Sequence, residues 1–205
     1  MPQDRRQFLQ RLFLGSLLVP AMLKNPATML KHMEQQSFNA GDMLNIVASK
    51  NSSSNDFDFL VGQWRIHNRK LKTRLNNCQE WAEFEAFGKC RKILNGFGNI
   101  DDFRTEFNSK PFEGMALRLF NPKQRLWSIY WADSNVVVLD VPQVGSFEDN
   151  IGKFYAKDVF EGKDIIVLYQ WDKTNADVPT WSQAFSADNG KTWEWNWYMT
   201  FYKQR

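Results

Sequence analysis

The stretch Phe57-Asp58-Phe59-Leu60-Val61-Gly62-Gln63-Trp64 decides the fold that we expect for the rest of the chain. Gly62 allows the backbone to pass close to another segment, and Trp64 can plug one end of a sheet that closes on itself. A first strand follows directly, from Arg65 to Leu71. Upstream, the sequence is typical of a leader and a linker, whereas downstream it alternates between strand and turn patterns.

Strand patterns separated by turn residues recur as far as Lys203, without a long helical periodicity. Clear turns are Asn121-Pro122-Lys123-Gln124 and Glu161-Gly162-Lys163. Because no helices cover such a sheet, it must close on itself or split into two packed layers. We predict an all-β fold, a single closed up-and-down antiparallel β-barrel of about eight to ten strands, since closure removes exposed edges. A two-sheet sandwich is the alternative.

The N-terminal residues match an export signal of the twin-arginine type. The sequence Asp4-Arg5-Arg6-Gln7-Phe8-Leu9-Gln10 pairs two arginines before x-Phe-Leu, and the apolar run Leu12–Val19 follows. This run is too short to span a bilayer, and no Cys follows it that could carry a lipid anchor. We therefore expect residues 1–24 to be a helical leader read by the export machinery, and the protein to be periplasmic. The alternative is an ordinary amphipathic helix in a cytoplasmic protein.

Residues 25–55 are expected to form a partly helical linker. Met29 and Met33 have helical spacing, whereas the Ser- and Asn-rich residues 49–56 cannot bury a core. The β-barrel domain is therefore expected to span residues 56–205.

Composition limits the possible functions. Aromatic residues make up 15% of the 205 residues, including 9 Trp and 17 Phe, which requires a bulky interior or an aromatic-lined cavity. Lys and Arg are scattered among Asp and Glu at a net charge of +3, so no nucleic-acid-binding stripe is expected. Two Cys and two His are too few for a structural zinc site, and we expect no metal and no cofactor. Cys78 and Cys90 are expected to be free thiols, because a continuous extended segment would hold them too far apart for a disulfide.

Strand alternation groups the side chains that could form a site. Gly114, Ala116 and Arg118 share one face, so an arginine lies beside very small residues, and space plus a fixed charge suggests a ligand site. A buried arginine needs a carboxylate partner or a ligand that supplies one. The polar groups that we expect inside the barrel are Arg91, Asn99, Asp101 and Arg118.

In the last strand, Trp193, Trp195 and Trp197 are expected to share one face, and Glu194 and Asn196 the other. The alternation alone does not decide which face of a strand points inward.

His67 lies in the first strand, on the opposite face from Trp64. It could act as an acid–base group or a haem ligand, or it could be an ordinary surface residue. No later histidine exists to serve as its partner, so haem binding is not expected. Asp101 and Asp102 follow a Gly-rich corner, where they could transfer protons, hold a cation or simply form a polar loop.

The stretch Ser186-Ala187-Asp188-Asn189-Gly190-Lys191-Thr192-Trp193 fits the Asp-box pattern S-x-D-x-G-x-T-W. In this hairpin the Ser and Asp side chains cap backbone N–H groups. The motif occurs once, so it predicts a structural turn and gives no support to glycosidase activity.

Three stretches resemble a family of bacterial lipocalin-like (calycin-type) barrels whose function is not known. They are Phe59-Leu60-x-Gly62-x-Trp64, the sequence WSIYWAD from Trp127 to Asp133, and the closing pair Trp181–Asp188 and Trp193–Trp197. The resemblance covers roughly residues 56–203. It implies a closed antiparallel barrel with a cavity and no assigned activity. A related barrel group binds haem through a histidine late in the chain, which this sequence lacks.

We expect the protein to bind a small apolar or aromatic molecule with one anionic group. Aromatic rings would give affinity, and Arg91 or Arg118 would bind the acidic end. The expected ligand-binding residues are Trp64, His67, Arg91, Asn99, Asp101, Arg118, Trp127, Trp131, Trp171, Gln183, Glu194, Asn196 and Trp197.

Two alternatives remain open. One is a small-substrate enzyme of the hydrolase or isomerase type, in which Glu194, Asp101 or His67 acts with Arg118. It needs an inward carboxylate whose pKa is raised by desolvation. The other is a cell-envelope accessory protein whose barrel is filled by side chains.

Overall fold

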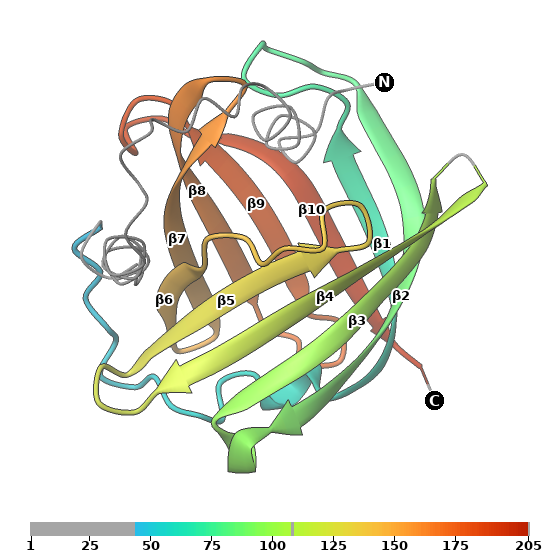
Figure 1. Ribbon diagram of the computed structural model, residues 1–205. Helices are drawn as coiled ribbons and strands as arrows, with labels where there is room; N and C mark the ends of the chain where they lie inside the picture. The colour runs from blue at the N-terminus through green and yellow to red at the C-terminus, as the bar shows by residue number, and fades with distance from the viewer. Residues whose placement is uncertain (1–43, 108, 205) are drawn as a thin grey trace, which may run out of the picture.

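The computed structural model describes residues 44–107 and 109–204, which form a closed barrel of ten antiparallel strands (Figure 1). Each strand pairs with its neighbours in sequence, and β1 closes the ring by pairing with β10. The strands are β1 (Gly62–Leu71), β2 (Trp81–Ile93), β3 (Gly98–Phe107), β4 (Lys110–Asn121), β5 (Leu126–Asp133), β6 (Gln143–Glu148), β7 (Ile151–Phe160), β8 (Lys163–Asp172), β9 (Thr180–Ser186) and β10 (Glu194–Lys203). The predicted closed barrel is confirmed, and the sandwich alternative is wrong.

Two short 3-10 helices accompany the strands in the described part of the chain, η1 (Asp58–Leu60) before β1 and η2 (Leu94–Gly96) between β2 and β3. Neither is long and apolar enough to cross a bilayer. The predicted leader at residues 1–24 and the linker residues up to 43 lie outside the described residues.

The first strand begins as the sequence predicts. Gly62 has a φ of 134°, in the region of backbone space that favours glycine. Trp64 is 2% exposed, and its indole Nε1 donates a hydrogen bond of 2.7 Å to the carbonyl of Leu60. Trp64, Ile66 and Asn68 are buried, so the even-numbered positions of β1 point into the barrel.

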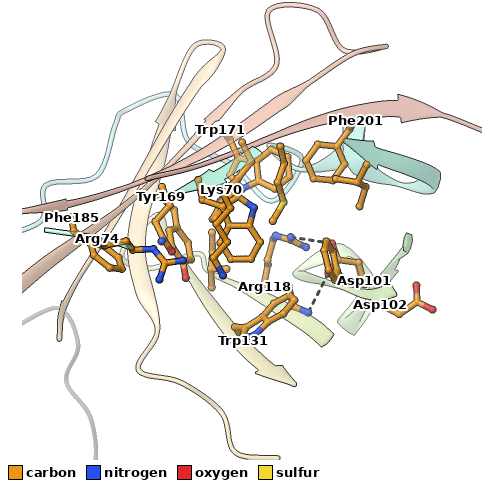
Figure 2. Close-up of a pocket in the computed structure, with 18 residues that line it drawn as sticks. Lys70, Arg74, Asp101, Asp102, Arg118, Trp131, Tyr169, Trp171, Phe185 and Phe201 are labelled. Carbon is orange, nitrogen blue, oxygen red and sulfur yellow. Dashed lines mark hydrogen bonds and ion pairs between the residues drawn. The ribbon is translucent and has the colours of Figure 1, made fainter. Parts of the chain in front are cut away.

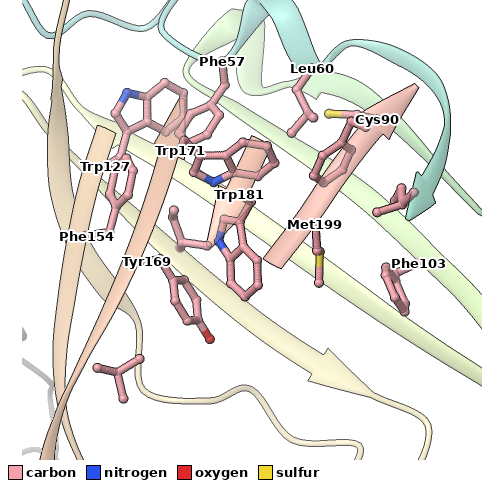
Figure 3. Close-up of a cluster of buried hydrophobic side chains, with 14 of the residues drawn as sticks. Phe57, Leu60, Cys90, Phe103, Trp127, Phe154, Tyr169, Trp171, Trp181 and Met199 are labelled. Carbon is pink, nitrogen blue, oxygen red and sulfur yellow. The ribbon is translucent and has the colours of Figure 1, made fainter. Parts of the chain in front are cut away.

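An aromatic plug, the cluster of Phe57 with Trp127, Phe147 and Trp171, fills the end of the barrel next to η1. The ring of Phe57 is 1% exposed and lies 4.9 Å from Trp127, 5.0 Å from Phe147 and 5.9 Å from Trp171, measured between ring centroids. Figure 3 shows Phe57 gathered with Trp127 and Trp171. Edge-to-face packing of this kind buries large apolar areas, so the plug closes this end of the barrel.

Residues 49–56, which their composition assigns to the end of a linker, are hydrogen-bonded to the barrel. The backbone N–H of Ser49 donates to the hydroxyl of Ser146 over 2.9 Å. The Asp56 carboxylate accepts from the Ser52 hydroxyl over 2.8 Å and from Trp127 Nε1 over 3.2 Å. This polar segment is therefore ordered by hydrogen bonds rather than by burial of apolar side chains.

The expected face pattern of the last strand is wrong, because β10 contains a β-bulge. Trp195 pairs with Ala184, but Trp197 pairs with Gln183, so the register shifts between the two tryptophans. Asn196 is fully buried. The three tryptophans consequently do not share a face.

The Asp-box turn has the predicted structural role. Ser186 Oγ accepts from the N–H of Gly190 over 2.8 Å, and the Asp188 carboxylate accepts from the N–H of Thr192 over 2.9 Å. The hydrogen bond from the Thr192 hydroxyl, with these turn contacts, lowers the pKa of Asp188 to about 2.

Both cysteines are free thiols, as predicted. Cys90 is buried on β2, and burial raises the pKa of its thiol to about 12.

We predict that Phe57→Ala lowers the free energy of unfolding by about 3–5 kcal/mol, because it leaves a cavity among the rings of the plug. The control is Phe87→Ala, since Phe87 is 49% exposed on β2 and its loss should change stability by less than about 0.5 kcal/mol. Urea unfolding followed by circular dichroism measures both. Equal stability of the two variants would contradict the role assigned to the plug.

Candidate ligand-binding site

A cavity of about 90 Å³ lies inside the barrel on the inner side of the plug (Figure 2). At about 30 Å³ per molecule, the share of a water molecule in the liquid, such a volume has room for about three waters. A single aromatic ring takes up all of this space, since a cavity of about 150 Å³ binds benzene. The aromatic side chains that line it are Phe103, Trp131, Tyr169, Trp171, Trp181, Phe185, Trp197 and Phe201.

Small residues on β4 shape this part of the barrel, and Ala116 lines the cavity. Gly114, Ala116 and Arg118 are all buried on the inner face of β4, as the alternation predicts. A Cβ at position 114 would lie 2.3 Å from the ring of Trp131. Glycine at this position therefore allows the indole to lie against β4, and Trp131 forms part of the cavity wall.

Arg118 lies at the base of the cavity, against the plug. It is 4% exposed, and its guanidinium carbon lies 5.3 Å from the ring centroid of Phe57 and 5.6 Å from that of Trp171. Nη1 donates to Asn99 Oδ1 over 2.9 Å, and Nη2 donates to Asp101 Oδ2 over 3.0 Å. Asp101 is thus the carboxylate partner that a buried arginine needs.

Opposing effects act on the pKa of the Asp101 carboxyl. Burial raises its pKa above the ordinary value, whereas the ion pair with Arg118 and a 3.2 Å hydrogen bond from the N–H of Ala116 act to lower it. On the other side of the pair, Arg118 Nε is buried without an acceptor among the described residues. The guanidinium that lines the cavity therefore also carries a buried N–H group without an acceptor in the described part of the chain.

A second polar group lies in the wall formed by β9 and β10. Gln183 Nε2 donates to Asn196 Oδ1 over 2.8 Å. Trp197 Nε1 donates to Asn68 Oδ1 over 3.0 Å. Gln183 and Trp197 line the cavity, and Asn196 and Asn68 hold them from behind.

Sequence reasoning missed several lining residues, including two cations. Lys70 Nζ lies 4.0 Å from the ring centroid of Trp197, and the Arg74 guanidinium lies 5.9 Å from that of Phe185. The inward alternation of β1 leads from Asn68 to Lys70 and could have found the lysine. Arg74 comes from the loop after β1, where no periodicity applies.

Three residues of the predicted site do not line the cavity. His67 occupies an outward position of β1, and its Nδ1 lies 2.8 Å from the Glu85 carboxylate. Arg91 is exposed on β2. Glu194 accepts 2.9 Å hydrogen bonds from the N–H of Leu75, which anchor the loop after β1. Strand alternation places His67 and Arg91 on the outer face of the barrel, and the contact with Leu75 holds Glu194 away from the cavity.

The remaining predicted residues divide between the cavity and its supports. Asp101, Arg118, Trp131, Trp171, Gln183 and Trp197 line the cavity. Asn99 and Asn196 support Arg118 and Gln183 by hydrogen bonds. Trp64 and Trp127 are buried in the core rather than in the cavity wall. Of the three acid–base candidates named from the sequence, only Asp101 lies in the cavity.

No protein-family model matches the sequence, and a search of curated proteins finds no related sequence. The fold is similar to that of a solved structure, the S-type phycobiliprotein lyase CPES from Guillardia theta, with a TM-score of 0.51. The match covers 76% of this chain and 94% of the lyase chain, at 9% sequence identity. This chain therefore shares its barrel fold with that structure, and at such low identity the likeness shows the fold alone.

We predict that Arg118→Met lowers the free energy of unfolding by about 3–5 kcal/mol, because it leaves the buried Asp101 carboxylate without its cation. The double variant Arg118→Met/Asp101→Asn should recover much of this loss. In the single variant the loss of stability should shrink as pH falls. Folding raises the pKa of the Asp101 carboxyl, so the folded state is favoured when this group is protonated and loses stability as pH rises through that pKa.

Urea unfolding at several pH values measures these effects. Arg104→Met is the control, because Arg104 pairs with Asp102 on the surface and its side chain is 65% exposed. A double variant as unstable as the single one would show that the ion pair does not explain the loss.

Proposed function

We propose that the protein binds a small aromatic carboxylate inside its barrel. The observation that carries this proposal is the buried Arg118 guanidinium at the base of a cavity walled by aromatic rings. The Arg118 guanidinium lines the cavity and has N–H donors beyond those bonded to Asn99 and Asp101, so a carboxylate can accept from it. The ring of the ligand packs against Trp131 and Trp171.

The surroundings strengthen both contacts. Low dielectric inside the barrel makes a charged hydrogen bond to Arg118 stronger than it would be in water. The small volume favours single-ring acids over long fatty acids or large pigments, unless side chains at the cavity wall move. A cavity of this kind also argues against the alternative in which side chains fill the barrel.

The alternative of a small-substrate enzyme has less support. Asp101 is in the cavity and burial raises its pKa, but the carboxylate is hydrogen-bonded to Arg118. His67 and Glu194 do not line the cavity, so no second acid–base group from the predicted set faces the ligand. Binding without chemistry is the function that this arrangement supports best.

The test compares benzoate and cinnamate with benzyl alcohol, a neutral analogue, and with palmitate, which exceeds the cavity. We expect the two aromatic acids to quench tryptophan fluorescence and to bind about tenfold or more tightly than benzyl alcohol, since hydrogen bonds to charged groups are the strong ones. Palmitate should bind weakly, because it is too large for the cavity.

The matched variant is Arg118→Met/Asp101→Asn, which removes both charges together and should bind the acid and the alcohol equally. Isothermal titration calorimetry provides the affinities. Absence of binding by any aromatic acid to the unmodified protein would overturn the proposal.

We also propose that residues 1–24 direct export through the twin-arginine pathway, on the strength of the Arg5-Arg6-x-Phe8-Leu9 pattern. Replacement of both arginines by lysine should retain the protein in the cytoplasm of a bacterium that has this pathway. Arg11→Lys is the control that preserves the pair. Cell fractionation measures the outcome, and equal periplasmic recovery of all three forms would contradict the proposal.

A further inference from the structure

The side-chain amide of Gln183 is held in one orientation by hydrogen bonds that end on the backbone. Asn196 Nδ2 donates to the carbonyl of Glu194 over 3.3 Å. Because a carbonyl oxygen can only accept, this contact fixes the NH₂ of Asn196 on that side and leaves its Oδ1 to face Gln183. Asn196 Oδ1 accepts from Gln183 Nε2 over 2.8 Å, so Gln183 must present its NH₂ group to Asn196.

The carbonyl oxygen of Gln183 is consequently directed away from Asn196. Gln183 is 6% exposed and lines the cavity, and no described residue donates a hydrogen bond to its Oε1. The nearby indole N–H of Trp197 is already engaged by Asn68, whose own Nδ2 donates to the carbonyl of Ile66 over 3.0 Å. The cavity therefore contains an amide acceptor, Gln183 Oε1, whose orientation is fixed by the hydrogen bond between Gln183 and Asn196.

This acceptor lies across the barrel from Arg118. Gln183 belongs to β9 and Arg118 to β4. In the ten-stranded ring these strands are five places apart in either direction, so they form opposite walls. The two groups that line the cavity differ in kind, since the Arg118 guanidinium can only donate and Gln183 Oε1 can only accept.

We infer that the ligand carries a hydrogen-bond donor at the end of its ring opposite the carboxylate, and that Gln183 is the residue that selects it. The ligand class is thus a para-hydroxylated or para-aminated aromatic acid, which spans the barrel from Arg118 to Gln183. This inference rests on the proposed function, because it takes the acid to be bound at Arg118. A methoxy group in the same place brings oxygen against oxygen, and the Gln183 carbonyl then lacks a donor.

The first test uses the unmodified protein and four acids: benzoate, 4-hydroxybenzoate, 4-methoxybenzoate and 2-hydroxybenzoate. Isothermal titration calorimetry should show 4-hydroxybenzoate binding about three- to tenfold more tightly than benzoate, with 4-methoxybenzoate weaker than both. The 2-hydroxy isomer should gain less than the 4-hydroxy isomer, because its donor lies on the wrong side of the ring. This series does not depend on the folding of any variant.

The second test uses Gln183→Met, which keeps the length of the side chain and removes the acceptor. In this variant the preference for 4-hydroxybenzoate over benzoate should disappear. Gln63→Met is the control, since Gln63 is exposed on β1 and its loss should leave the preference intact. If the unmodified protein binds benzoate and 4-hydroxybenzoate equally, the inference about Gln183 fails while the proposed function stands. If it binds none of the four acids, the proposed function fails as well.

Discussion

Hydrogen bonds between β1 and β10 close the sheet, in a register that runs from Trp64 opposite Lys203 to Lys70 opposite Trp197. A closed ring has no free edge, so each strand has one face that must point inside. Side chains at those positions are buried whether or not they are apolar. Arg118 and Asn68 are inside for this reason, and each is hydrogen-bonded as buried polar groups require.

The interior is divided between an apolar plug and a cavity with polar groups in its wall, and one aromatic ring serves both parts. Phe57 packs edge-to-face on Trp127 and Phe147, and the Arg118 guanidinium lies over the same ring. The residues that close the barrel therefore also position its buried cation. Stability and the proposed binding are consequently linked at this point, because a disturbed plug would displace the guanidinium as well as expose the core.

Much of this arrangement could be predicted from the sequence. Turn residues and two-residue alternation predicted the closed barrel, and Gly114 and Ala116 next to Arg118 predicted a charge beside open space. The direction of each face could not be predicted, since a period of two leaves two choices. The bulge at Trp195 and Trp197 depends on backbone pairing with β9, which no side-chain pattern records. The hydrogen-bonded segment 49–56 was missed because its polar composition is also that of a linker.

Two features of the interior are hard to explain by stability alone. A buried ion pair such as Arg118 with Asp101 is weak evidence for stability, since well-packed apolar residues often do as well or better. A cavity also lowers stability, because its lining lacks partner atoms. A core shaped only for folding would have a larger residue than Ala116 and no guanidinium beside it. The ion pair and the cavity occur at the same place, and both are explained if a ligand binds there. The neutral amides of Gln183 and Asn196 fit the same explanation, because they present an oriented acceptor to the cavity without burying another charge.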